Sequence, residues 1–217
     1  GSGTNQASTF LRKYLSASAS KVQHLTLGGE VTSIGELAFW LASGLKSVTI
    51  LDSVTTLGYA PFLTCRKLET LVLPDSVTTL GVHQGISRLC DGCTSLTSVV
   101  IGDGLATLPK DAFKGCTSLQ NVTIGSAVTT IDATAFSGCG AITTLNLRTP
   151  LVEASYTTTS TFLTKYLSAS ASKVQHLTLG GKVTSVGGLA FYQASSLESV
   201  IMESFAFIFK LPRTWAR

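Results

Sequence analysis

Residues 119–139 decide the fold, and they read LQNVTIGSAVTTIDATAFSGC. Within the first six residues, the apolar Val122 and Ile124 flank Thr123, and this alternation predicts a strand that directs two side chains into a core. The Val-Thr-Thr-Ile that follows predicts a short second strand or an arc. The closing Ala-Phe-Ser-Gly-Cys is too short for a long helix, and we interpret it as one turn of helix that ends at its glycine. The three segments together predict one coil of a solenoid.

The opening pattern of this stretch, an apolar residue at the first, fourth and sixth positions, occurs eight times in the 217 residues. The first residues of the eight units are spaced by 23, 23, 28, 23, 23, 32 and 23 positions: Val22, Leu45, Leu68, Leu96, Leu119, Ile142, Val174 and Leu197. A period of 23 falls in the leucine-rich-repeat range of about 20–29. No single coil can bury its apolar edge, so the coils must stack. We therefore predict a leucine-rich-repeat solenoid that is mainly β. Parallel strands would form one face, and short helical or 3-10 turns the other.

The three segments quoted above resemble the BspA-type leucine-rich repeat, and the match covers roughly residues 22–147 and 174–202. The resemblance implies a surface or secreted protein, of a kind found in bacteria and some protists, that adheres to host or matrix proteins or makes other protein contacts. The sequence departs from the pattern at a five-residue expansion within Gly81–Cys93 and at an interruption over 148–173. The last unit also loses its second half, which is replaced by residues 205–217.

These departures divide the chain into five predicted parts. They are an N-terminal flank with an amphipathic cap helix (1–21), an array of six units (22–147), an interruption with a cap-like helix (148–173), two further units (174–202) and a divergent C-terminal cap or docking tail (203–217).

A longer duplication overlies the short repeat. Lys13–Gly29 and Lys165–Gly181 are identical over all seventeen positions, at an offset of 152 residues. Around the start of each copy, apolar residues recur at i, i+1, i+4 and i+5, which predicts a short amphipathic helix. These residues are Phe10, Leu11, Tyr14 and Leu15 in the first copy, and Phe162, Leu163, Tyr166 and Leu167 in the second.

The composition is charge-poor, with 13% charged and 44% hydrophobic residues, whereas about a quarter of residues are usually charged. Thr and Ser must therefore cover much of the surface, which favours a place outside the cell. The net charge of +4 comes from scattered basic residues, and no basic stripe with interleaved aromatics predicts nucleic-acid binding. No apolar run approaches the ~20 residues of a membrane span. Gly1-Ser2-Gly3 is typical of an expression remnant or a processed start.

The cysteines follow the repeat. Cys65, Cys93, Cys116 and Cys139 each stand three residues before the next unit, where Ala42 and Ala194 stand in other units. A position that accepts Cys or Ala predicts a small buried site. Cys90 is additional, and with Cys93 it forms a CxxC. A local disulfide or a metal site are the alternatives there, although a metal site needs about four ligands.

Motifs for catalysis are missing from the sequence. It contains no Gly-x-Ser-x-Gly elbow, phosphate loop or His-Glu-x-x-His, and its acidic residues are dispersed. His24 and His176 occupy the same outward strand position and are interpreted as surface polar residues. We therefore expect no enzyme, no cofactor and no metal.

The outward strand positions form two neutral rows that suit either a solvated sheet or a ligand face, as solenoids commonly use. The candidate binding residues in these rows are Thr49, Thr70, Val72, Ser98, Val100, Asn121, Thr123, Thr144, Asn146, His176 and Thr178. The leading hypothesis is an extracellular or cell-surface adhesion module that binds a matrix, host or surface protein through this face.

The alternative hypothesis is a structural protein that assembles end to end, because both ends of a solenoid expose unpaired backbone and core. The 152-residue unit restarts before the chain stops, as in an array that continues. A candidate association tail contains Phe205, Phe207, Phe209 and Trp215, with a period of two among the phenylalanines. This tail would either cap the last coil of its own chain or dock on the N-terminal end of another copy.

Overall fold

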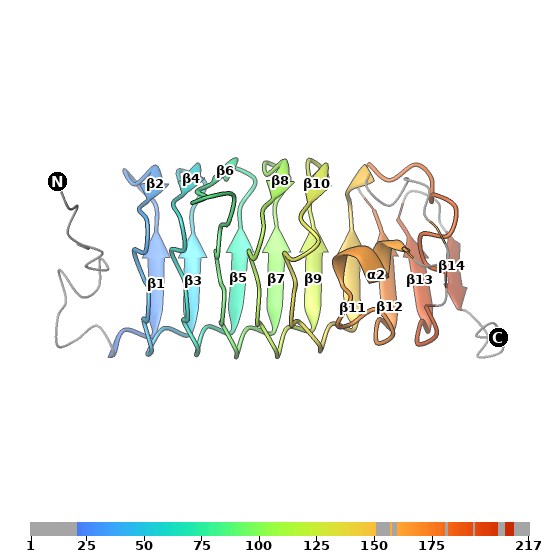
Figure 1. Ribbon diagram of the computed structural model, residues 1–217. Coiled ribbons are helices and arrows are strands. Elements are labelled where there is room, and N and C mark those ends of the chain that lie inside the picture. Colours follow the sequence, from blue (N-terminus) through green and yellow to red (C-terminus); the bar gives the residue numbers. More distant parts are fainter. Residues whose placement is uncertain are drawn as a thin grey trace.

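The computed structural model describes residues 21–150, 157, 160–180, 182–192 and 194–203, together with the backbone of 207–210. The described chain winds into coils whose long strands stack side by side into one nine-stranded sheet (Figure 1). This arrangement confirms the predicted leucine-rich-repeat solenoid.

The main sheet takes one strand from each coil. Its order is β1 (His24–Leu27), β3 (Ser47–Ile50), β5 (Thr70–Leu73), β7 (Ser98–Ile101), β9 (Asn121–Ile124), β11 (Thr144–Leu147), β12 (His176–Leu179), β13 (Ser199–Met202) and β14 (Phe207–Lys210). Neighbours are parallel except β13 and β14, which are antiparallel. The register pairs equal positions of successive coils. It thereby confirms the predicted buried column of Leu71, Val99, Val122 and Leu145, each at most 2% exposed.

The Val-Thr-Thr segments form the short second strands that the sequence allowed. These strands are β2 (Ser33–Ile34), β4 (Thr56–Leu57), β6 (Thr79–Leu80), β8 (Thr107–Leu108) and β10 (Thr130–Ile131). They belong to two small sheets, β2-β4-β6 and β8-β10. The break between β6 and β8 coincides with the expansion Gly81–Cys93, in which His83 and Ile86 pair with each other. The extra residues therefore divide the short strands into two separate sheets, while the main sheet continues without a break.

The closing segments of the coils are short turns in which the amide of residue i+3 donates to the carbonyl of residue i, as from Cys65 N to Phe62 O and from Cys116 N to Phe113 O. Left-handed residues explain why these turns stay short. In the coil that ends at Cys116, Asp111 has φ 59° and Gly115 has φ 70°. A residue in this region interrupts a right-handed helix. Among the described residues, α2 (Phe162–Tyr166) is the one α-helix.

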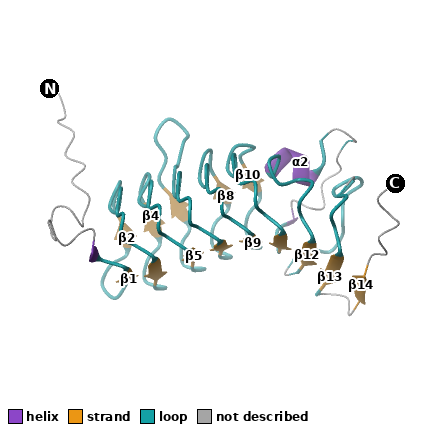
Figure 2. Ribbon diagram, turned by 90° about the horizontal axis from the view of Figure 1, so that it is seen from below, coloured by secondary structure: helices purple, strands orange, loops and turns teal. Residues whose placement is uncertain are grey.

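Helix α2 closes the coil before β12 on the side opposite the main sheet (Figure 2). Thr161 caps it by accepting from the Thr164 amide. The apolar positions predicted for this helix are buried. The Phe162 amide donates to Ala190 O at 2.9 Å, and the Phe162 ring centroid lies 6.0 Å from that of Phe191. Residues 148–173 thus interrupt the repeat in sequence but not the sheet, because β11 pairs directly with β12. The corresponding residues 10–15 lie outside the described part of the chain.

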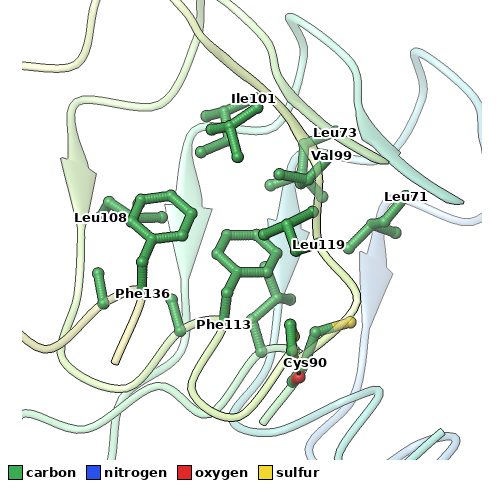
Figure 3. Close-up of a cluster of buried hydrophobic side chains, with 14 of the residues drawn as sticks. Leu71, Leu73, Cys90, Val99, Ile101, Leu108, Phe113, Leu119 and Phe136 are labelled. Atoms are coloured by element: carbon green, nitrogen blue, oxygen red, sulfur yellow. Dashed lines mark hydrogen bonds between the residues drawn. The ribbon is translucent and has the colours of Figure 1, made fainter. Parts of the chain in front are cut away.

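A column of aromatic rings fills the core beside the strands. Phe39 stacks on Phe62, and Phe113 stacks on Phe136, with centroids 5.6 and 5.5 Å apart. Between these two pairs the column contains Cys90, which Figure 3 shows beside Phe113. The backbone bonds establish this equivalence, because Phe62 N donates to the residue before Cys90 and Cys90 N to the residue before Phe113.

Candidate binding face

The predicted binding residues lie on six adjacent strands of the main sheet, from β3 to β12. Each strand alternates buried residues with residues that are exposed or half-buried, as in β5, where Leu71 and Leu73 are buried and Thr70 and Val72 are exposed. All eleven candidates occupy the outer positions. They therefore form part of the solvent-facing side of the sheet.

The strand register brings these residues into two straight rows. In one row Val72 lies beside Val100, Val100 beside Thr123 and Thr123 beside Asn146. Neighbouring strands are about 4.8 Å apart, so residues far apart in sequence form one continuous surface. The structure brings together every candidate residue of the sheet.

The row positions carry no formal charge. Charged side chains stand instead just before the strands, as at Lys46, Glu69 and Glu198. Two large apolar side chains are exposed in the rows, Val72 at 50% and Ile201 at 40%. Ile201 is not among the predicted binding residues, although it occupies the same outward position on β13, opposite Thr178. Such a face offers hydroxyl, amide and apolar contacts.

Two hydrogen-bonded pairs cross neighbouring strands on this face. His24 Nδ1 lies 2.8 Å from Ser47 Oγ, and His176 Nδ1 lies 2.9 Å from Ser199 Oγ. Sequence reasoning missed both pairs, although the signal was there: each serine follows its histidine by 23 residues, one repeat length. Because the pairs are exposed, we interpret them as polar ties between strands.

All five cysteines are free and buried, which confirms the predicted small buried positions. Each of four thiols donates to a carbonyl of the preceding coil: Cys65 Sγ to Phe39 O, Cys93 Sγ to Phe62 O, Cys116 Sγ to Cys90 O and Cys139 Sγ to Phe113 O, at 3.1–3.2 Å. No three His, Cys, Asp or Glu side chains of the described residues are grouped so that they could hold a metal ion. The thiols therefore serve as core contacts.

The electrostatics of the thiols agree with this role. Burial raises the pKa of Cys65 and of Cys90 well above the ordinary value. The hydrogen bond with Cys139, followed by burial, raises the pKa of Cys116. The three thiols consequently stay protonated at neutral pH, and a thiolate nucleophile is disfavoured at these positions.

The expansion Gly81–Cys93 provides a second exposed surface. Val82 is 50% exposed, and the His83 ring centroid lies 5.8 Å from that of Tyr59. This loop lies away from the two rows, since its residues precede β7 and sit beside the small sheets. It is a separate candidate for contacts with a partner.

The predicted association tail is described only in part. Phe207 and Phe209 belong to β14, opposite Met202 and Val200 of β13. Phe205 and Trp215 lie outside the described residues. Because β14 pairs with the last coil of its own chain, its backbone occupies the edge that β13 would otherwise expose.

Comparisons with known proteins agree with this geometry. The pattern of the "BspA type Leucine rich repeat region" matches residues 9–84 and 86–210 in six copies. A leucine-rich repeat protein of T. pallidum, TpLRR, has a similar fold, with a TM-score of 0.55 and 22% identity over 72% of this chain and 69% of that protein.

Weaker similarities extend to a leucine-rich cell surface protein of Faecalibacterium prausnitzii (TM-score 0.29, 17% identity, 74% and 60% of the chains). The pneumococcal vaccine antigen PcpA is similar at a TM-score of 0.29 and 15% identity, over 76% and 58% of the chains. No curated protein matches the sequence. In the described part of the chain, no helix combines the length and apolar character needed to cross a membrane.

Proposed function

Since the chain belongs to the BspA-type leucine-rich-repeat family, we propose that it is an adhesion module, extracellular or at the cell surface. It would hold protein partners on the two rows of its main sheet. The observation that supports this proposal most directly is the continuous register of the outward residues from β3 to β12. Repeat scaffolds present extended surfaces of this kind to partners.

The chemistry of the face indicates the kind of partner. The rows combine Thr, Ser and Asn with the apolar pair Val72 and Val100 and carry no formal charge. A complementary partner would place apolar and neutral hydrogen-bonding groups against them, such as an exposed β-surface of a matrix or host protein. We expect this binding to depend little on ionic strength, because electrostatic steering needs complementary charge.

The charge-poor composition and the family resemblance both support a place outside the cell. The same family resemblance supports a scaffold that binds without catalysing a reaction.

The test is capture of host or matrix proteins by immobilised protein. We expect the double variant Val100→Lys with Thr123→Lys to fold normally and to lose most of the capture, because two charges would be buried against a neutral partner. The matched control is Thr78→Lys with Thr129→Lys, which adds the same charge at exposed positions beside the small sheets and should capture as the parent does. If capture persists in the face variant but disappears when Val82 and His83 are replaced, the loop is the binding site and the proposal for the sheet is wrong.

A further inference from the structure

Two identical segments of this chain have different surroundings. In the second copy, Val174, Leu177 and Leu179 are 1%, 2% and 3% exposed. Their counterparts Val22, Leu25 and Leu27 in the first copy are only half-buried. The difference cannot come from the sequence, which is the same over Lys13–Gly29 and Lys165–Gly181. It comes from the neighbour, because β1 is the first strand of the sheet whereas β12 lies between β11 and β13.

The neighbour of the second copy is the coil that ends in β11. Leu145 and Leu147 pair with Leu177 and Leu179 in parallel register. At the two ends of β12, Gln175 N donates to Thr143 O at 2.8 Å and Gly180 N donates to Leu147 O at 3.0 Å. The β11 coil therefore satisfies the backbone of this segment along its whole length.

Polar side chains add specificity to the same contact. Ser170 Oγ accepts from Ile142 N at 3.1 Å and donates to Cys139 O. Lys173 Nζ donates to Gly140 O at 2.6 Å. The first copy has the same residue types at the corresponding positions, Ser18 and Lys21. Both the apolar and the polar groups that recognise the β11 coil are thus present a second time in every chain.

From these contacts we infer that the edge of β1 that faces away from β3 is a binding surface for the β11 coil of a second copy of this chain. In a closed monomer the chain's own residues 161–203 occupy the β11 coil. When these residues leave it, the first copy of the segment from another molecule takes their place, in the register that pairs Leu145 with Leu25 and Asn146 with Thr26. Each molecule then offers one acceptor coil and one donor edge, so the copies join head to tail.

The structure also indicates why the junction is β11 rather than the C-terminal end. The edge of β13 is occupied by β14, which runs antiparallel to it. The closed monomer is favoured in the unmodified chain, because a tethered segment competes at a high effective concentration. The intact second copy therefore acts as an internal competitor of assembly.

A pair of full-length variants tests the inference. Leu177→Asp places a charge in the contact between β12 and β11 and displaces the internal segment. We expect this variant to form oligomers whose mean mass at least doubles as concentration rises, by light scattering, while the unmodified chain stays monomeric. The matched control is Leu25→Asp with Leu177→Asp, which should be monomeric because the donor edge is also charged. A monomeric Leu177→Asp variant, or equal association of the double variant, would overturn the inference.

Cross-linking in trans tests the register and does not depend on oligomer size. A chain with Asn146→Cys and Leu177→Asp, mixed with a Thr26→Cys chain, should form a disulfide-linked heterodimer on mild oxidation. A Thr49→Cys chain is the control, because Thr49 lies on the interior strand β3 and should remain unlinked. No heterodimer with Thr26→Cys, or an equal yield with Thr49→Cys, would show that β1 does not dock on β11.

Discussion

Arg148 and Asp103 form an ion pair across two coils, with Arg148 Nη2 2.5 Å from Asp103 Oδ2. The other carboxylate oxygen of Asp103 accepts from Ser126 N at 2.7 Å. Asp103 therefore joins the turns that follow β7, β9 and β11, and it reinforces the stack on the side where the main strands end.

A double-mutant cycle measures this pair. Both side chains are partly exposed, at 37% for Arg148 and 25% for Asp103, so we expect a coupling free energy of about 1 kcal/mol or less that shrinks in high salt. Asp103→Ala should destabilise more than Arg148→Ala, because it also removes the acceptor of the Ser126 amide. Denaturant unfolding at low and high salt gives both numbers. Equal losses for the two single variants would contradict this account.

A charge in the buried column should be far more costly. We expect Val122→Asp to lower the free energy of unfolding by several kcal/mol, because the carboxylate would be desolvated without a partner. Asn121→Asp adds the same charge at the neighbouring exposed position and should leave stability almost unchanged. Thermal melts of the two variants make the comparison. Similar melting temperatures would show that the register of β9 is wrong.

The buried thiols predict a loss of stability at alkaline pH. Folding raises the pKa of Cys65, Cys90 and Cys116 above the ordinary 9.0. Above that value the unfolded chain loses protons that the folded chain keeps, so the unfolded state is favoured as pH rises. Each such thiol contributes a slope of about 1.4 kcal/mol per pH unit. Cys65→Ala, which places at this position the residue found at Ala42, should remove one such slope between pH 9 and 11. If the difference in unfolding free energy between Cys65→Ala and the parent stays constant from pH 9 to 11, the Cys65 thiol does not cause a loss of stability at alkaline pH.

Labelling of the native protein gives an independent measurement on the cysteines. All five are buried, so we expect slow modification by a thiol reagent without denaturant and rapid modification of all five after unfolding. The resistance should include Cys90 and Cys93, which are also reduced in the structure. Rapid labelling in the native state would contradict a buried ladder.

The turn position before the repeated cysteine offers a stabilising substitution. Thr64 has φ 56° where Gly92, Gly115 and Gly138 have φ between 70° and 79°. A residue with a Cβ pays roughly 1 kcal/mol in this region. We therefore expect Thr64→Gly to stabilise the protein by about 0.5–1 kcal/mol.

The reverse change, Gly115→Ala, should destabilise by a similar amount, because an added Cβ would meet nothing closer than 3.7 Å and only the backbone strain remains. Thr94→Gly, at an exposed position without a positive φ, is the control and should not stabilise. Chemical unfolding should give the highest unfolding free energy for Thr64→Gly and the lowest for Gly115→Ala. Any other order would contradict the explanation from backbone strain.

The strands, their register and the short helix could be predicted from the sequence, because apolar residues recur at the same positions of each unit. Leu71, Val99 and Val122 revealed the strands and their register through the repeat length alone. The short helix at Phe162–Tyr166 followed from its apolar spacing. The rows of the face followed from the same alternation.

Other features depend on neighbours that the sequence does not mark. Cys90 stands in the column where other coils have a phenylalanine, and the residue before it is Leu89 rather than the alanine or proline of those coils. The closing turns stay short because residues such as Leu37 and Ala60 adopt positive φ, which only glycine usually signals. Leu25 is half-buried whereas Leu177 is buried, although the two residues lie in identical sequences. The difference follows from the position of their strands in the sheet.

The gap between β6 and β8 has a consequence for how the protein folds. Solenoids fold as chains of nearest-neighbour couplings, and at this point the coupling rests on the main sheet and the turns, without the second strand pair that joins the coils on either side. Nearest-neighbour coupling is therefore weaker at this junction than between coils that share a second strand pair, such as the coils of β4 and β6. A block that contains β1 to β6 and a block that contains β7 onward are the natural folding units, and fraying that starts at one end would pause at the loop that separates them.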